Sequence, residues 1–427
     1  MVIKEKTLNP GDKVILQTRD REWEGIILES YDSSTLLLKL SSGYNIGIKE
    51  DEVLNVNVLE KAKDIKKQVK ITKNDKLPNV AMIITGGTIS SRLDPKTGGV
   101  ISTDAEEILN IAPEIKNICN ISIIEKPFMK WSENMSFSDW EILAKTVENL
   151  INKDDIRGII ITHGTDFLHY TSAALSFFLG KLNKPVALTY SQRSIDRAST
   201  DASFNLVCAA KYAISDIAEV AIIGHKNSND NICLAMPGTK VRKLHTSRRD
   251  AFKVINSIPL AEISKSEFKI LKGFNARNNN KIKVDVNYND KVALIQIYPG
   301  QDPEIIDYYG EKGYKGIVLE LAGIGQLPAQ DAKYNWLPKV KKAIDKGIVM
   351  VGAPQTLYGR LNPKVYSAGR DLEKTGLVYL GDILPETAFV KLAFVLGHKD
   401  WIKQNKVKEK LLENFSNEFN NKIEFEE

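Results

Sequence analysis

Two short segments of the sequence place hydroxyl groups and glycines directly after apolar runs. Residues 80–90 read VAMIITGGTIS and residues 158–166 read GIIITHGTD. A continuous apolar run of this length is typical of a buried parallel strand, and glycines at its carboxyl end let the backbone turn sharply. Because ligands of open α/β sheets bind at the carboxyl ends of the strands, the two segments predict a small-molecule site.

The side chains at these strand ends favour nucleophilic chemistry. A threonine hydroxyl is a weak nucleophile and needs a base or an adjacent charge to lose its proton. Thr165, Asp166 and a nearby lysine could form that relay, and N–H groups beside the glycines could bind an oxyanion. On its own, a strand followed by Gly86-Gly87 is more often a plain connection, so the second segment is what favours a catalytic site.

The rest of the chain predicts an α/β body with a small β-module ahead of it. Short alternating strands in residues 1–60 predict a small β-barrel, which could bind RNA or a partner protein or be a structural appendage. A lysine-rich linker, 61–77, follows it. Apolar strands then alternate with amphipathic helical patterns, which predicts a doubly wound domain over 78–270 and a smaller α/β domain over 290–400. Residues 401–427 predict a terminal amphipathic helix or tail.

Composition places the chain among ordinary globular proteins. Its 427 residues are 43% hydrophobic and carry a net charge of +5, which permits contact with nucleic acid without arguing for it. There is no apolar run of about 18 residues, so we predict no membrane span. Residues 1–6 lack the apolar core of a signal peptide, which favours a cytoplasmic protein. The three cysteines, an odd and widely spaced set, predict buried thiols.

Other catalytic or ligand-binding patterns are missing from the sequence. No Gly-x-x-x-x-Gly-Lys-Ser/Thr phosphate loop is present, so nothing indicates ATP binding by this chain. Cys208 has no histidine nearby in a nucleophile-like turn. His163 and His169 lack a third ligand at metal-like spacing, so we predict structural roles for them and no metal site.

The two threonine segments resemble the paired signatures of the asparaginase/glutaminase family, and the resemblance covers about residues 78–400. It implies that Thr88 attacks a side-chain amide, forms an acyl-enzyme and releases ammonia. Thr165 and Asp166 would then belong to a second threonine relay, with Asp166 also near the α-amino group of the substrate. Gly164 would contribute to substrate binding.

Two further segments are similar to motifs of that family. Residues 238–247 (GTKVRKLHTS) resemble the segment of the catalytic lysine, which implies that role for Lys243, with Lys240 as the competing choice; without the resemblance, either lysine would be read as a solvated loop cation. Residues 131–135 (WSENM) resemble the substrate loop. There Ser132 would bind the α-carboxylate and Glu133 the α-ammonium group, although a helix-capping loop is an equal reading of the residues alone.

The segment ahead of the α/β body narrows the resemblance. With residues 38–48 (LKLSSGYNIGI) and the C-terminal segments 358–362, 365–372 and 382–388, nearly the whole chain is similar to the D-type subunits of archaeal glutamyl-tRNA(Gln) amidotransferases. This implies that the chain hydrolyses glutamine and passes ammonia to an E-type subunit. That partner would bind tRNA(Gln) and use ATP and magnesium, with no cofactor in this chain. The assembly implied is a heterotetramer around a homodimer of this chain.

Two segments depart from the family pattern, and two alternatives stay open. Residues 322–328 (AGIGQLP) and 352–356 (GAPQT) differ from the family in a region where its members help to complete a neighbouring subunit's site. One alternative is a free-standing asparaginase or glutaminase with an added β-domain. The other is an RNA-binding or scaffold protein with an inactive amidase site, against which the presence of Thr88, Thr165, Asp166 and Lys243 argues.

Overall fold

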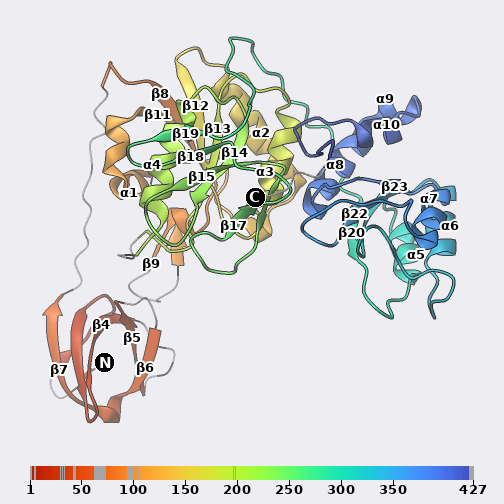
Figure 1. Cartoon of the computed structure of the whole chain (residues 1–427). Coiled ribbons are helices and arrows are strands. Elements are labelled where there is room, and N and C mark those ends of the chain that lie inside the picture. Colours follow the sequence, from red (N-terminus) through yellow and green to blue (C-terminus); the bar gives the residue numbers. More distant parts are fainter. Residues whose placement is uncertain are drawn as a thin grey trace.

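The two apolar runs form neighbouring parallel strands inside an eight-stranded sheet of this computed structural model (Figure 1). Strand β8 (Asn79–Ile84) pairs with β12 (Ile156–Thr162). The sheet order is β11-β8-β12-β13-β14-β15-β18-β19. The structure describes residues 2–3, 6–28, 30, 32, 34–41, 45–61, 74–93, 100–102, 105–195, 197 and 199–422.

The chain reverses its direction across the sheet at β8. From β8 it passes to β11 on one side and then returns to β12 on the other, so the carboxyl ends of β8 and β12 form the topological switch point where α/β proteins bind ligands. The first five strands of the order are parallel and the last three are antiparallel. The other strands are β11 (Asn120–Glu125), β13 (Val186–Thr189), β14 (Val220–His225), β15 (Cys233–Pro237), β18 (Ala261–Ile263) and β19 (Phe268–Ile270).

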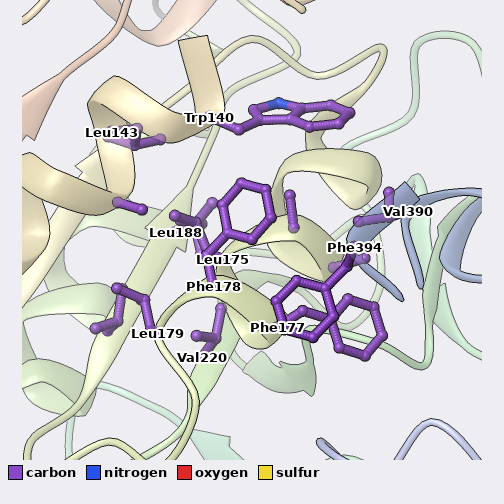
Figure 2. Packing of buried hydrophobic residues seen from close by; sticks show 14 of the residues in the cluster. Trp140, Leu143, Leu175, Phe177, Phe178, Leu179, Leu188, Val220, Val390 and Phe394 are labelled. Carbon is purple, nitrogen blue, oxygen red and sulfur yellow. The ribbon is translucent and has the colours of Figure 1, made fainter. Parts of the chain in front are cut away.

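Alternate residues of β8 face opposite helical layers. Ala81 and Ile83 join the core beneath α2 (Phe137–Ile151) and α3 (Leu168–Phe178), part of which Figure 2 shows. Val80, Met82 and Ile84 join a second core with the remaining two helices, as the two-residue period of a strand requires. Those helices are α1 (Ala105–Asn110) and α4 (Ala202–Ala213), and two hairpins, β9 (Ser91–Leu93) with β10 (Val100–Ser102) and β16 (Val241–Lys243) with β17 (Phe252–Val254), complete the domain.

The second α/β unit is a four-stranded parallel sheet in the order β20-β21-β22-β23. Its strands are β20 (Val292–Gln296), β21 (Gly316–Leu321), β22 (Val349–Pro354) and β23 (Val378–Tyr379). Helices α5 (Glu304–Glu311), α6 (Leu337–Asp345) and α7 (Ser367–Lys374) cover one face. Helix α8 (Pro385–Gly397) covers the other and packs against α3, so one apolar core runs through both units. Figure 2 shows Phe177 and Phe178 of α3 facing Val390 and Phe394 of α8.

The end of the chain, for which we expected a terminal amphipathic helix or tail, contains short helices. Two short helices, α9 (Lys399–Lys403) and α10 (Val407–Leu412), are followed by an irregular segment. In this segment the side chain of Glu418 is fully buried and forms an ion pair with Lys391 of α8. Residues 423–427 lie outside the described part.

The N-terminal module consists of short strands, as predicted, and these form an antiparallel sheet with an open ladder. Five strands pair in the order β6-β5-β4-β3-β7, and among the described residues no ladder joins the edge strands β6 and β7. The small β-barrel that we expected is therefore an open five-stranded sheet, with no closed ladder among the described residues. The alternating pattern still buries one face, with a core of Val14, Leu16, Ile27, Leu36 and Leu38. The strands are β3 (Lys13–Thr18), β4 (Glu22–Leu28), β5 (Thr35–Leu40), β6 (Asn45–Lys49) and β7 (Val53–Glu60), with a small pair β1 (Val2–Ile3) and β2 (Lys6–Thr7).

Most of the predicted linker lies outside the described residues. None of the helices in the described part of the chain has the length and apolar character that crossing a bilayer requires. The three cysteines are free and buried, as predicted.

Substitution Leu175→Ala tests the core shared by α2, α3 and the sheet. Leu175 is fully buried, so its loss leaves a cavity, and we expect the free energy of unfolding to fall by about 2–5 kcal/mol. Ile142→Ala on the exposed face of α2 is the control, since Ile142 is 45% exposed and a surface change of this kind costs about 0.5 kcal/mol or less. Denaturant unfolding measures both, and equal losses would contradict this view of the core.

Candidate active site

The first glycine turn leaves no room for side chains. Gly86 and Gly87 have φ values of +111° and +79°, a region that L side chains avoid. A Cβ at position 87 would lie 2.3 Å from the Cα of Gly164, and one at position 86 would lie 2.4 Å from the carbonyl oxygen of Lys130. The two motifs therefore meet backbone against backbone at the switch point.

Side-chain hydroxyls beside the turn hold this contact in place. The backbone N–H and the hydroxyl of Thr85 both donate to the carbonyl oxygen of Thr162, at 3.1 and 2.8 Å. The hydroxyl of Ser91 donates to the carbonyl oxygen of Gly87 at 2.6 Å. Thr85 is fully buried, so its hydroxyl serves the turn. Thr88 follows Gly87 at the start of a 3-10 turn, Thr88–Ser90, and is only partly buried.

The predicted substrate loop lies against the second motif. Ser132 and Gly164 are in contact, since a Cβ on Gly164 would lie 3.1 Å from atoms of Ser132. Ser132 is buried, and its hydroxyl oxygen accepts a hydrogen bond from the backbone N–H of Phe167 at 3.3 Å. Glu133, the next residue, is exposed. The structure thus places Ser132 and Gly164 together, with Glu133 at the surface beside them.

Lys243 reaches the second motif from the β16–β17 hairpin. Its Nζ atom lies 2.9 Å from the Thr165 hydroxyl and 2.7 Å from Oδ1 of Asp166. The Lys243 side chain is 11% exposed, whereas that of Asp166 is 59% exposed. The adjacent residues Thr165 and Asp166 therefore form one hydrogen-bonded group with Lys243, which is distant in sequence, and the group opens to solvent at the carboxylate.

The competing lysine lies elsewhere. Lys240 is buried, and its Nζ atom is 2.7 Å from Oδ2 of Asp382. Burial lowers the pKa of Lys240, and Asp382 opposes that shift. The side chain of Lys240 is thus committed to an ion pair with the second unit, and it is Lys243 that contacts the threonine motif.

Neither histidine near the second motif is suited to acid–base work near neutral pH. Burial lowers the pKa of His163 to about 4 and that of His169 to about 3, the latter helped by Arg242 and Lys243. Both rings are therefore neutral in the physiological range. The described side chains include no cluster of three or more histidine, cysteine, aspartate or glutamate residues arranged to hold a metal ion.

Three family models match the chain. The model described as asparaginase, N-terminal, matches residues 79–275; the glutaminase/asparaginase C-terminal domain matches 291–409; and the GatD N-terminal domain matches 8–59. Curated relatives named as the D-type subunit of glutamyl-tRNA(Gln) amidotransferase match nearly the whole chain. The protein from Pyrococcus furiosus is 42% identical over 97% of this chain and 96% of its own length. That from Methanococcus maripaludis strain C7 is 38% identical over 97% and 99%.

The chain belongs to the family of D-type glutamyl-tRNA(Gln) amidotransferase subunits.

Solved structures confirm the α/β fold of the body of this D-type family member. The thermostable L-asparaginase from Thermococcus kodakarensis has a TM-score of 0.72 and 28% identity, and it covers 81% of this chain and 100% of its own. L-asparaginase I from Vibrio cholerae has a TM-score of 0.68 and 26% identity, with coverage of 81% and 99%. The GatD N-terminal domain model accounts for the module ahead of this body.

The two segments that depart from the asparaginase pattern lie after strands of the second sheet. Residues 322–328 follow β21 and form a tight loop, in which Ala322 and Gln326 exchange backbone hydrogen bonds. Residues 352–356 span the end of β22 and the turn after it, where the side chain of Gln355 donates to the carbonyl oxygen of Ile297. Both segments therefore lie at the carboxyl ends of strands in the second sheet of this D-type family member.

Sequence reasoning missed the neighbours that support Lys243. Arg242 contacts the buried carboxylate of Glu386, with Nε and Oε1 3.0 Å apart. Burial raises the pKa of Glu386, and the Arg242 guanidinium opposes that shift. Successive strand residues point to opposite faces, so Arg242 contacts α8 while Lys243 contacts Thr165. The sequence signal for these neighbours is segment 382–388, whose resemblance to the D-type family does not show which residues it contacts.

Substitution Gly87→Ala tests the backbone contact between the motifs. A residue with a Cβ at positive φ costs about 1–2 kcal/mol, and here the Cβ also meets the backbone of Gly164. Gly347→Ala is the matched control, because Gly347 also has a positive φ of +85° but nothing lies within 4 Å of its Cβ position. We expect Gly87→Ala to lower the free energy of unfolding by clearly more than Gly347→Ala. Equal losses in denaturant unfolding would show that the motifs do not meet as described.

Proposed function

We propose that this chain hydrolyses glutamine through Thr88 and supplies the ammonia to a partner that amidates glutamyl-tRNA(Gln). The observation that carries the proposal is the hydrogen-bonded group of Lys243, Thr165 and Asp166 beside the Gly87–Gly164 contact. This group occurs in a chain that aligns over nearly its full length with relatives named as D-type subunits of glutamyl-tRNA(Gln) amidotransferase.

The reaction divides into two steps at one hydroxyl. Thr88 Oγ1 attacks the amide carbon of glutamine and gives up its proton toward the relay of Thr165, Lys243 and Asp166. The amide nitrogen takes up a proton and leaves as ammonia, and a glutamyl ester of Thr88 remains. Water then attacks the ester, which releases glutamate and returns the proton to Thr88. Splitting the hydrolysis in this way lowers the barrier of each step.

Backbone N–H groups of the two glycine turns would stabilise the negative charge that develops on the amide oxygen. N–H groups that are fixed before the reaction stabilise an oxyanion without reorganising. The contact between Gly87 and Gly164 fixes both turns at the strand ends. We propose that N–H groups of these turns bind the oxyanion formed from the amide oxygen.

The amino-acid end of glutamine is assigned to the neighbouring polar groups. Because the Ser132 oxygen accepts from Phe167, its own proton remains available for an α-carboxylate oxygen. The exposed carboxylates of Asp166 and Glu133 would hold the α-ammonium group. Gly164, which lies against Ser132, would let the substrate approach the backbone closely.

The remaining half of the reaction is assigned to a partner protein. That partner, an E-type amidotransferase subunit, would bind tRNA(Gln) and use ATP and magnesium to activate the misacylated glutamate, and this chain would need no cofactor of its own. The mild net charge of +5 fits a protein that leaves most RNA binding to its partner. We propose a heterotetramer built around a homodimer of this chain, working in the cytoplasm where tRNA is charged.

The two alternatives are less well supported. A free-standing asparaginase is favoured by the solved neighbours, which are L-asparaginases. Those neighbours, however, are at most 28% identical, whereas the D-type relatives reach 42% and also share the N-terminal module. An inactive scaffold would not require Lys243 to be held against Thr165 and Asp166.

Substitution Thr88→Ala tests the nucleophile. Without the hydroxyl no acyl-enzyme can form, so we expect ammonia release from glutamine to fall by roughly 10³-fold or more. Thr146→Ala on the surface of α2, whose hydroxyl donates only to the helix backbone, is the matched control and should keep full activity. Unchanged ammonia release by the Thr88 variant would refute the mechanism.

Coupling to a partner is tested by glutamine hydrolysis in three mixtures. These contain the chain alone, the chain with its co-purifying partner, and both with glutamyl-tRNA(Gln). We expect the rate of glutamate formation to rise in the complete mixture, because an uncoupled glutaminase would waste its ammonia. Equal rates in all three, together with rapid asparagine turnover by the chain alone, would instead support the free-standing enzyme.

A further inference from the structure

The segment that carries Lys243 is held on one side by its own hairpin. We call residues 238–243 the lysine segment. Its three-residue strand β16 pairs with β17, and Lys243 lies opposite Phe252. Such a short two-stranded hairpin has little stability of its own, so further contacts are needed to fix the lysine against Thr165.

The start of α8 and the loop before it provide three such contacts. Lys240 forms its buried ion pair with Asp382. Arg242 contacts Glu386. The hydroxyl of Thr387 donates to the carbonyl oxygen of Thr239 at 3.0 Å. Side chains from residues 382–387 therefore contact three of the six residues of the lysine segment.

The end of the chain provides a fourth contact. We call residues 413–420 the tail segment. The hydroxyl of Thr239 donates to the carbonyl oxygen of Ser416 at 2.8 Å, and the hydroxyl of Ser416 donates to the carbonyl oxygen of Ser176 on α3 at 2.8 Å. The backbone N–H of Asn420 donates to Asp382 at 3.0 Å. The tail segment thus links the lysine segment, α3 and the loop before α8.

Buried charge holds the tail segment itself. Lys391 of α8 and Glu418 lie 2.6 Å apart, and both side chains are fully buried. Glu418 also accepts the backbone N–H groups of Phe415 and Ser416, at 3.1 and 2.7 Å. A buried ion pair whose remaining oxygen positions are satisfied in this way is geometrically exacting, so the carbonyl oxygen of Ser416 has a fixed place.

We propose that residues 382–387 and the tail segment position Lys243 for catalysis through Thr239, which is clamped between Thr387 and Ser416. Thr239 and Thr387 are positioning residues in this arrangement, since their hydroxyls donate to the backbone carbonyl oxygens of Ser416 and Thr239. The inference rests on the proposed function of Lys243. It extends that function by assigning the positioning of the Lys243 side chain to the second unit and the tail segment.

The position of a relay group governs the rate of the chemical step. A misplacement of about 1 Å at a catalytic group can cost roughly 10²-fold in rate. Of the groups assigned to substrate binding, Ser132, Glu133 and Gly164 lie outside the lysine segment. Asp166, which contacts Lys243, is one of two carboxylates assigned to the α-ammonium group. Loosening this segment should therefore lower kcat and leave KM nearly unchanged, whereas a general loss of folding would reduce the amount of active protein without this selectivity.

The test is the double variant Thr239→Val/Thr387→Val, which removes both hydroxyls and keeps the side-chain volumes. Assayed in the full chain with its partner and glutamyl-tRNA(Gln), it should show kcat lowered by about tenfold, with KM changed by no more than about twofold. Restoring the hydroxyl with Thr239→Ser/Thr387→Ser should recover most of kcat. Hydrogen exchange of a peptide covering residues 238–244 should speed up in the valine variant alone.

Thr375→Val is the matched control. Thr375 is also buried, and its hydroxyl donates to the carbonyl oxygen of Leu372, at the end of α7 and outside these contacts. It should keep the wild-type kcat and the wild-type exchange of residues 238–244. An equal fall of kcat in the control, or a wild-type kcat in the double variant, would overturn the positioning role.

Failure of the proposed function would look different. If the wild-type protein hydrolysed neither glutamine nor asparagine in the complete mixture, the catalytic role of Lys243 would be refuted. The expected effect of the double variant on kcat would be refuted with it. Hydrogen exchange would then decide the structural part alone. Faster exchange of residues 238–244 in the double variant would support the clamp, and unchanged exchange would overturn it.

Discussion

The backbone contact between Gly87 and Gly164 is the constraint on which the site depends. Strands β8 and β12 are parallel neighbours, so the turns that follow them lie side by side at the same edge of the sheet. A side chain at position 87 would meet the backbone of the second turn. Glycine is therefore required where the motifs meet. The contact brings Thr88 and the adjacent residues Thr165 and Asp166 to the same edge of the sheet.

The lysine reaches this edge by a different route, and this explains why the second unit matters. Strands β8 and β12 come directly from the parallel sheet, whose two faces are covered by separate cores. Lys243 instead lies on a short hairpin supported by α8 and the tail segment. Helix α8 belongs at once to the second sheet and to the core beneath α3. Thr88, which we propose as the nucleophile, and Thr165 are thus held by one unit, whereas Lys243 is held by contacts with both units.

Much of this arrangement could be predicted from local sequence because local physics determines it. Apolar runs that end in glycine and threonine predicted the two buried parallel strands, and alternating patterns predicted the short strands of the N-terminal module. Whether that module closes into a barrel could not be predicted, because closure depends on pairing between edge strands that no local pattern encodes. The burial of the tail segment could not be predicted either, because the sequence around Glu418 does not show that this acid pairs with Lys391.

The choice between Lys240 and Lys243 shows why chemistry alone was not enough. A lysine that acts as a base near neutral pH is expected to have its pKa lowered by burial or by a neighbouring cation. Lys240 meets that criterion, because burial lowers its pKa. Its amine nevertheless pairs with Asp382, 142 residues away, whereas Lys243 contacts Thr165, 78 residues away. Two lysines three residues apart thus have different roles because of partners that are distant in sequence. Geometry has to be settled before pKa is used as a guide to function.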